Sequence, residues 1–281
     1  MYKMIVIDLD GTLLNSQKEI NPKDADMINK AYEEKGVISV IATGRSYVCA
    51  NYIGHLVGDN FAQYIISSNG SIVKDNVKNL YLRKKNISNE NTLKIMKTLK
   101  KYNFKYIIDI ESKVVANGRL VNQQNLGKIG QPYEIVEDLE KYFIDNAAES
   151  ITITLIGNRQ MLIEAKYELE KIEDLKTTEI CESLDIRENE REIVTYIDVI
   201  NKESSKKEAI ILLAEYLGIN KEEIIVIGDG GNDIPMFEIA GLKIAMENAL
   251  DIVKKEADYI TTNNNESGVA KAIQKFIFDR E

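Results

Sequence analysis

Two aspartates near the start of the chain are the first residues whose spacing suggests chemistry. Asp8 and Asp10 stand two apart in DLDGTLL, directly after the apolar residues MIVI. That spacing can direct two carboxylates at one small volume, where they repel each other unless a cation or a shared proton relieves them. A hard divalent ion with oxygen ligands, Mg²⁺, does so and leaves positions for water and phosphate. The alternative is a plain capped turn, because Asp and Gly are common turn residues.

A second acidic loop, GDGGND at residues 228–233, follows another apolar run. We expect Asp229 to ligate the same ion from across the sheet, Asn232 to donate to an anion, and Asp233 to orient a nearby lysine. An Asx turn that leads into a helix at Ile234 is the simpler alternative. Two acidic loops after two buried strands are harder to explain as turns, so together they favour a metal site.

Two further segments carry groups that bind anions. In ATGRS, Thr43 and Gly44 offer a hydroxyl and backbone N–H groups at the start of a predicted helix, although Thr43 or Ser46 could simply cap that helix. Lys206 begins another predicted helix. As a point charge it would suit a phosphate, but spacing alone favours an ordinary surface lysine, since most lysines are solvated.

The elements that must position these residues follow from the apolar runs. Four short runs, each followed at once by a polar or glycine-rich turn, predict buried strands within residues 4–12, 37–45, 64–70 and 223–233. Helical patterns alternate with them, for example from Pro22 to Lys35 with Gly36 as a C-terminal stop. This alternation predicts an α/β fold with a Rossmann-like parallel sheet, whose ligands bind at the carboxyl ends of the strands. All four polar loops fall at that edge.

The middle of the chain has a different pattern. Between about Arg83 and Thr195, helical segments mix with alternating strands such as SITITLI, which is typical of a sheet with one solvated face. We therefore expect a core domain over residues 1–83 and 196–281, with an α+β domain inserted over 84–195. The charged run at 188–192 predicts a solvated loop.

Composition narrows the function classes. The 281 residues include 36 Lys and Arg against 45 Asp and Glu, a formal net charge of −9, which argues against a nucleic-acid binder. No apolar run approaches the length of a membrane span, so we expect no membrane association and a cytoplasmic protein. Cys49, Cys181 and the lone histidine form no metal or disulfide pattern, and Cys49 has no basic partner evident in the sequence.

Taken together, these segments identify a resemblance. DLDGTLL, ATGR, SSNG, Lys206 before a helix, GDGGNDIPM, AGLKIAMENA and EADYITTNNNESGVA occur in the order found in the Cof-type (HAD-IIB) phosphatases of the haloacid dehalogenase superfamily. The chain resembles this family over about residues 1–83 and 196–281. The middle resembles the family's substrate-covering cap in size and α+β character, but not by motif.

The resemblance implies a hydrolase of small phosphorylated metabolites, such as a sugar phosphate or a phosphorylated cofactor, acting with Mg²⁺ through an aspartyl-phosphate. In it, Asp8 is the nucleophile and Asp10 the general acid and base. Mg²⁺ is held by Asp8, the backbone carbonyl of Asp10, and Asp229. The resemblance assigns the phosphoryl oxygens to Thr43, Gly44, Lys206 and Asn232. Asp233 would support Lys206 or the metal, and Arg45 and Asn69 would lie near the leaving group.

Several alternatives remain open at this stage. Lys207 stands where the family often has glycine, which makes it a fallback anion ligand. A phosphomutase of the same superfamily and a non-enzymatic binding module on the same fold are the competing functions. Specificity is expected to come from the cap, where Asp109, Arg119 and Asn122 are candidate contacts to the leaving group. The sequence sets neither the substrate nor the oligomeric state.

Overall fold

The computed structural model of the protein describes residues 1–111, 113–118, 133–186 and 191–279. The chain divides into two compact units. The core unit comprises Met1–Lys84 and the chain from Ser205 onward, and the inserted unit comprises Lys85–Ser204. Within the described ranges, no helix combines the length and apolar character that crossing a bilayer requires.

The core unit is built on one eight-stranded sheet. In spatial order its strands are β15 (Tyr259–Ile260), β14 (Leu242–Ala245), β13 (Ile224–Gly228), β1 (Met4–Ile7), β2 (Ile38–Ala42), β3 (Tyr64–Ser67), β4 (Ile72–Asp75) and β5 (Leu80–Lys84). The strands from β15 to β3 are parallel, and β4 and β5 add an antiparallel edge. All four strands predicted from the apolar runs are present, and β1 and β13 are fully buried.

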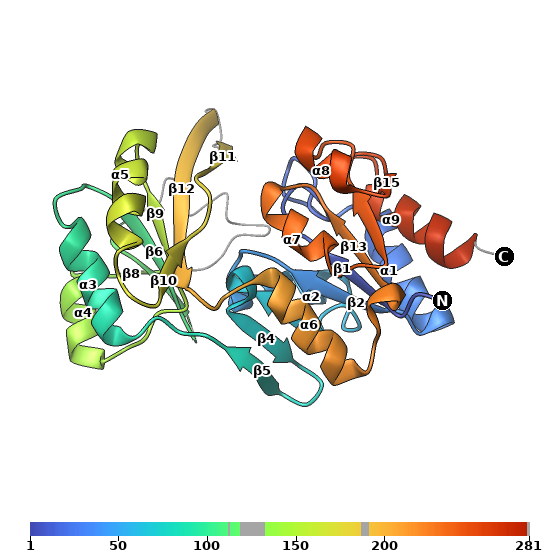
Figure 1. The fold of residues 1–281 in the computed structure, drawn as a ribbon, viewed down its shortest axis with the longest axis horizontal. Helices are drawn as coiled ribbons and strands as arrows, with labels where there is room; N and C mark the ends of the chain where they lie inside the picture. The colour runs from blue at the N-terminus through green and yellow to red at the C-terminus, as the bar shows by residue number, and fades with distance from the viewer. Residues whose placement is uncertain (112, 119–132, 187–190, 280–281) are drawn as a thin grey trace. The chain divides into compact units, whose positions relative to one another are not determined.

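The strand order creates a switch point between β1 and β13 (Figure 1). From β1 the chain proceeds outward to β2 and β3, whereas from β13 it proceeds in the opposite direction to β14 and β15. Right-handed crossovers then require the two sets of helices to cover opposite faces of the sheet. At such a point the loops after the two central strands splay apart and leave room for a ligand.

The helices of the core unit form two groups in keeping with this topology. The first group packs around α1 and the second around α7. The first group consists of α1 (Pro22–Lys35), α2 (Tyr47–Val57) and α9 (Gly268–Ile273). The second group consists of α6 (Lys206–Leu217), α7 (Ile234–Phe237) and α8 (Asp251–Glu256). As the sequence predicts, α1 begins at Pro22 and ends at Lys35, and Gly36 caps it with a left-handed φ of 66°.

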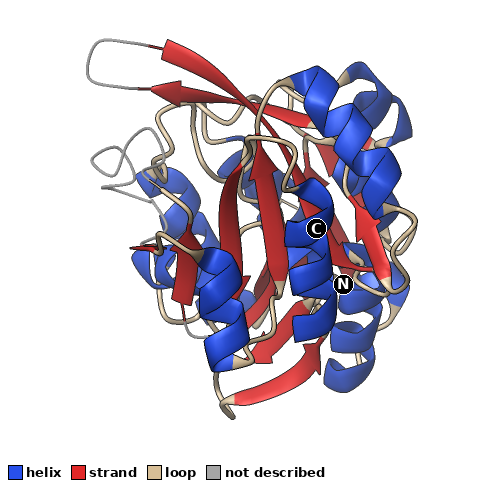
Figure 2. Ribbon diagram, turned by 90° about the vertical axis from the view of Figure 1, so that its left-hand side faces the viewer, coloured by secondary structure: helices blue, strands red, loops and turns tan. Residues whose placement is uncertain are grey.

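The inserted unit has its own sheet and core. Its main strand order is β10 (Leu175–Thr177), β12 (Arg191–Asn201), β9 (Thr152–Ile156), β6 (Lys105–Ile110), β7 (Lys113–Ala116) and β8 (Glu134–Ile135). β11 (Cys181–Ile186) pairs with β12 as a two-stranded ribbon (Figure 2). One face of the sheet buries an apolar cluster under α3 (Asn89–Leu99), α4 (Leu139–Asn146) and α5 (Arg159–Leu169) (Figure 1).

The structure corrects one boundary of the inserted unit. The sequence predicts a junction between residues 195 and 196, but β12 continues to Asn201 and pairs there with β9 and β10. Cutting at 196 would split a strand, so the junction lies at Ser204–Ser205. In the predicted solvated loop at 188–192, residues 188–190 lie outside the described ranges, and Arg191 already begins β12.

The core unit buries the carboxyl group of Asp24. Its side chain on α1 is fully buried, and its Oδ1 accepts a hydrogen bond of 2.7 Å from the backbone N–H of Ala270 on α9. No described residue hydrogen-bonds its Oδ2. Burial raises the pKa of Asp24 to about 6, although the Ala270 hydrogen bond and Lys271 oppose the rise.

We predict that Asp24→Asn changes how stability depends on pH. The folded pKa lies above the unfolded value of roughly 3.9, so the native state is favoured at low pH and loses about 3 kcal/mol as pH rises through 6. The Asn variant keeps the acceptor without the charge, so its advantage over the parent should grow from pH 4.5 to pH 7.5 in urea unfolding. Asp26→Asn, exposed on the same helix, is the control. Equal pH slopes for all three proteins would contradict this account.

Candidate active site

A buried lysine connects the two acidic loops. Lys206 is the first residue of α6 and is 5% exposed. Its Nζ lies 2.8 Å from Asp8 Oδ1 and 2.9 Å from Asp233 Oδ1. The ordinary surface role that spacing alone favours for Lys206 is therefore wrong. Burial works against the charge of Lys206, but Asp233 and Asp8 outweigh it and raise its pKa, so the ammonium stays protonated.

Asp233 is fixed on both of its carboxylate oxygens. Oδ1 accepts from Lys206, and Oδ2 accepts from the backbone N–H groups of Asp229 and Gly230, each at 3.0 Å. This geometry shapes the loop after β13 around the carboxylate. Asp233 thus holds Lys206 and the backbone of Asp229 together, while Asn232 lies exposed one residue earlier.

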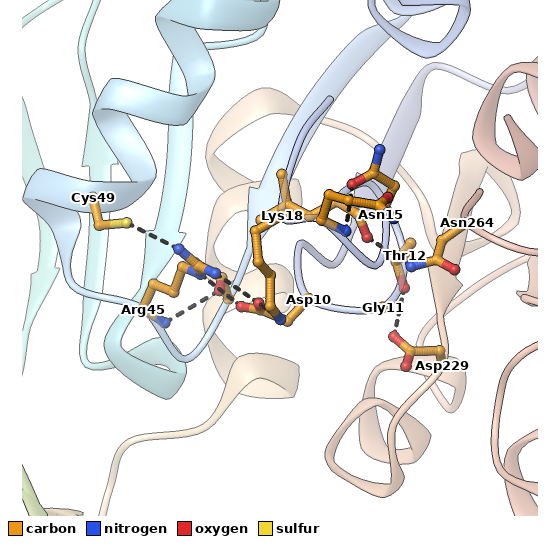
Figure 3. Close-up of polar contacts among 12 residues, drawn as sticks. Asp10, Gly11, Thr12, Asn15, Lys18, Arg45, Cys49, Asp229 and Asn264 are labelled. Carbon is orange, nitrogen blue, oxygen red and sulfur yellow. Dashed lines mark hydrogen bonds and ion pairs between the residues drawn. The ribbon is translucent and has the colours of Figure 1, made fainter. Parts of the chain in front are cut away.

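Asp8 and Asp229 follow the neighbouring parallel strands β1 and β13. Ligand oxygens of Asp8, Asp229 and Asp233 all lie within 4.8 Å of one another. The hydroxyl of Thr12 donates to Asp229 Oδ1 at 2.7 Å (Figure 3). Burial, with Asp233 adding to it, raises the pKa of Asp8 well above its usual range and that of Asp229 to about 7, against the opposing charge of Lys206.

The charges of this cluster fit a divalent cation. Lys206 brings one positive charge to the carboxylates of Asp8, Asp229 and Asp233, and two negative charges are left over. Carboxylate oxygens are the ligands that Mg²⁺ prefers. Asp8, Asp229 and Asp233 could each offer one oxygen to the ion, and Asp233 is the most heavily engaged of the three, because its two oxygens accept three hydrogen bonds.

Asp10 has a different set of partners from Asp8 and Asp233. Arg45 donates to it through Nε to Oδ2 at 2.6 Å and through Nη2 to Oδ1 at 2.7 Å, and Lys18 Nζ lies 2.7 Å from Oδ1 (Figure 3). Burial works against ionisation, but the charges and hydrogen bonds of Arg45 and Lys18 hold the pKa of Asp10 well below its usual range. Lys18 carries no signal in the motifs and is missed by sequence reasoning.

The loops after β2 and β3 hold each other in place. Arg45 N–H donates to Thr43 Oγ1 at 3.2 Å, and Ser46, not Thr43, caps α2 by accepting from Cys49 N–H. Asn69, with a left-handed φ of 56°, donates its N–H to the carbonyl of Thr43 at 3.1 Å. Its side chain lies beside Gly44, where a Cβ would come within 3.1 Å of Asn69 Oδ1.

Gly70 extends this contact to the start of α6. Its φ is 86°, and a Cβ there would lie 2.2 Å from the carbonyl oxygen of Ser205, the residue that precedes Lys206. Only a residue without a side chain permits this approach. The SSNG loop therefore contacts both the Thr43 loop and the backbone that presents Lys206.

The remaining residues singled out in the sequence have other surroundings than expected or lie outside the described residues. Lys207, the fallback anion ligand, pairs with Glu238 on the surface, so it does not serve the site. Cys49 does have a basic neighbour, because Arg45 Nη1 lies 3.4 Å from its Sγ. Asp109 is buried in β6. Arg119 and Asn122 lie outside the described residues.

Comparison with known proteins decides the family. The model of the haloacid dehalogenase-like hydrolases matches residues 5–273. The chain belongs to this family. It is 32% identical over 278 residues to 5-amino-6-(5-phospho-D-ribitylamino)uracil phosphatase YcsE of Bacillus subtilis, a match that covers 98% of this chain and 96% of that protein.

Solved structures agree with this assignment to the haloacid dehalogenase-like hydrolases. A haloacid dehalogenase-like hydrolase from Bacteroides thetaiotaomicron superposes with a TM-score of 0.82 at 26% identity, covering 98% of this chain and 99% of that one. The subclass IIB sugar phosphatase BT4131 does so with a TM-score of 0.74 at 25% identity, covering 98% of both chains. The protein is thus a phosphatase of this family.

We predict that Gly11→Ala separates site geometry from backbone strain. Gly11 has a φ of +87°, and a Cβ there would lie 2.2 Å from Asp229 Oδ2, whereas Gly36 has a φ of +66° with nothing described within 4 Å. Both Ala variants should lose about 1–2 kcal/mol of stability from the left-handed backbone. Displacement of Asp229 should cost Gly11→Ala about 100-fold in activity.

The measurement is phosphate release from p-nitrophenyl phosphate, together with urea unfolding. Gly36→Ala should keep the parent rate. Similar activities for the two variants would show that Asp229 does not need its observed position.

Proposed function

We propose that the protein hydrolyses small phosphate monoesters with Mg²⁺ through an aspartyl-phosphate on Asp8. The observation that carries the proposal is the buried Lys206 ammonium between Asp8 and Asp233, beside Asp229. A phosphate monoester is an anion and resists attack by a carboxylate. A fixed positive charge beside the attacking oxygen removes that obstacle.

The residues divide the reaction into two displacements. Asp8 attacks phosphorus as the bond to the leaving oxygen breaks, and Asp10 gives the leaving alkoxide its proton. Asp10 must take up that proton before this step, because Arg45 and Lys18 hold its carboxylate ionised in the structure. Asp10 then takes a proton from water as the water oxygen attacks phosphorus, which releases phosphate and restores the Asp8 carboxylate. A covalent intermediate replaces one difficult step by two easier ones. In this proposal the phosphoryl oxygens are held by Thr43, Gly44, Lys206 and Asn232, while Arg45 and Asn69 lie toward the leaving group.

The proposed metal ligands are Asp8, Asp229 and the backbone carbonyl of Asp10. The excess of negative charge around Lys206 and the close approach of the carboxylate oxygens support this set. When bound, the ion supplies positive charge to the phosphoryl oxygens and to the attacking carboxylate. Asp233 would act from outside the ligand set by holding Lys206.

We further propose a sugar phosphate or a phosphorylated cofactor precursor as the substrate, with the inserted unit setting specificity. YcsE is named for a phosphoribityl compound and BT4131 is named a sugar phosphatase, and both names support a polyol or sugar leaving group. Both cysteines are free thiols, which is compatible with the proposed cytoplasmic location.

We predict that activity requires Mg²⁺ and survives thiol alkylation. Excess EDTA should abolish phosphate release, and added Mg²⁺ should restore it, because Asp8 and Asp229 offer oxygen ligands. Neither thiol belongs to the proposed reaction. Full activity in EDTA would contradict the metal assignment, and a need for a sugar bisphosphate activator with little phosphate release would favour a phosphomutase.

We predict different losses for the two aspartates of DLDGT. Asp8→Asn should abolish turnover and leave no acid-labile phosphoryl-protein, because no neighbour replaces its bond to phosphorus. Asp10→Asn should lose about 10²–10⁴-fold on alkyl phosphates, and less on aryl phosphates that depart without a proton.

The measurement is rapid-quench trapping with labelled substrate, with exposed Asp26→Asn as the matched control. Two results would refute the assigned roles: a phosphorylated carboxylate in Asp8→Asn, or the parent rate on alkyl phosphates in Asp10→Asn.

A further inference from the structure

The two loops that carry the proposed metal ligands meet at Gly11. A Cβ on Gly11 would lie 2.2 Å from Asp229 Oδ2, so the backbone of the first acidic loop lies directly against the carboxylate of the second. Glycine fits there and adopts the observed φ of +87° without a steric penalty, but it also constrains the chain least of all residues. The next residue, Thr12, donates its hydroxyl to Asp229 Oδ1 (Figure 3). The peptide between Gly11 and Thr12 therefore needs support from elsewhere to keep its orientation.

Asn248 supplies that support. Its Nδ2 donates to the carbonyl of Gly11 at 2.7 Å, and its Oδ1 accepts from the backbone N–H of Asn264 at 2.9 Å. Because one partner is a carbonyl and the other an N–H, the two ends of the amide side chain cannot be exchanged. The N–H of the same peptide, on Thr12, donates to the carbonyl of Leu9 at 3.4 Å. Both polar groups of the peptide are therefore held.

The turn that carries Asn248 is itself attached to the second acidic loop. It follows β14, the neighbour of β13 in the sheet. Before Asn248, Met246 N–H donates to the carbonyl of Gly228 at 3.1 Å, and after it, Leu250 N–H donates to the carbonyl of Asp229 at 3.1 Å. Asn248 thus connects the backbone of the loop after β1 to the backbone of the loop after β13.

This connection acts on the spacing of the two loops more than on folding. Asn248 is exposed, and a side-chain hydrogen bond contributes about 1 kcal/mol to stability. The proposed ligands are divided between the loops, with Asp8 and the Asp10 carbonyl on one and Asp229 on the other. We propose that Asn248 is a positioning residue that holds the two loops at the spacing in which they bind Mg²⁺. This inference rests on the proposed function.

The test compares Asn248→Ala and Asn248→Asp with the parent. Ala removes both hydrogen bonds, whereas Asp keeps the acceptor for Asn264 and replaces the donor to Gly11 by a carboxylate oxygen. Asn265→Ala is the matched control, because Asn265 is also exposed and accepts from the N–H of Ser16, beyond the acidic residues of the first loop. Isothermal titration calorimetry measures the binding of Mg²⁺ alone. Urea unfolding in EDTA and phosphate release from p-nitrophenyl phosphate over a range of Mg²⁺ concentrations accompany it.

We expect Asn248→Ala to weaken Mg²⁺ binding about tenfold, because residues that orient metal ligands from outside the ligand set act on metal affinity. At saturating Mg²⁺, its kcat and its KM for p-nitrophenyl phosphate should stay within about threefold of the parent values. Asn248→Asp should also bind Mg²⁺ more weakly than the parent, although its added negative charge attracts a cation. Asn265→Ala should bind Mg²⁺ as the parent does. A purely structural role would lower stability and leave Mg²⁺ affinity unchanged.

The outcomes separate this inference from the function on which it rests. If the parent binds Mg²⁺ and needs it for activity, three results would each overturn the role of Asn248 alone. They are parent-like Mg²⁺ affinity in Asn248→Ala, equal or tighter binding in Asn248→Asp, and a loss in Asn265→Ala as large as that in Asn248→Ala. A parent that binds no Mg²⁺, or that hydrolyses the ester equally well in EDTA, would refute the proposed metal, and this inference with it.

Discussion

The arrangement of the core unit depends on burying one ammonium among several carboxylates. Lys206 is nearly inaccessible to solvent, as are both acids that it contacts, Asp8 and Asp233. Removing one partner of a buried ion pair leaves an uncompensated charge and is strongly destabilising. The three side chains come from separate parts of the chain, so this charge balance requires the strands and helices that carry them to meet at one point.

The parallel sheet meets that requirement through its topology. Asp8 and Asp229 follow neighbouring strands at the place where the strand order reverses, and backbone N–H groups of the second loop close around Asp233. Lys206 arrives from α6, whose first residues lie against Gly70. The same edge thus presents two distinct electrostatic environments. Around Asp8 negative charge is in excess, whereas around Asp10 two cations outnumber one carboxylate.

Much of this architecture could be predicted from the sequence, because buried strands and the loops after them have strong local patterns. The apolar runs predicted four strands, and the helix from Pro22 to Lys35 has the predicted bounds. The burial of Lys206 could not be predicted from spacing, since a lysine before an amphipathic helix is usually solvated and only tertiary packing encloses this one. The inserted unit's second boundary was misplaced because β12 continues its alternating pattern to Asn201 without a turn signal.

Lys18 was missed for another reason. Its contact with Asp10 arises from a left-handed turn that is held by hydrogen bonds to Asn15 and, at its base, by Asn264, and no short motif encodes that combination. From the sequence, the SSNG motif could be associated with the site. Its role in holding the neighbouring loops could not be predicted. Contacts between Asn69, Gly70 and the neighbouring loops depend on close backbone approach, which becomes apparent only when the strands are assembled.

The position of the second junction has a consequence for how such proteins diversify. The chain leaves the inserted unit at Ser204–Ser205, and Lys206 is the next residue. Ser205 also caps α6 and touches Gly70. An insertion or deletion at this junction would move Lys206 relative to Asp8 and Asp233. The first junction follows β5 at the edge of the sheet and contains no proposed site residue. Exchange of inserted domains during evolution should therefore tolerate insertions and deletions near Lys84 far better than near Ser205.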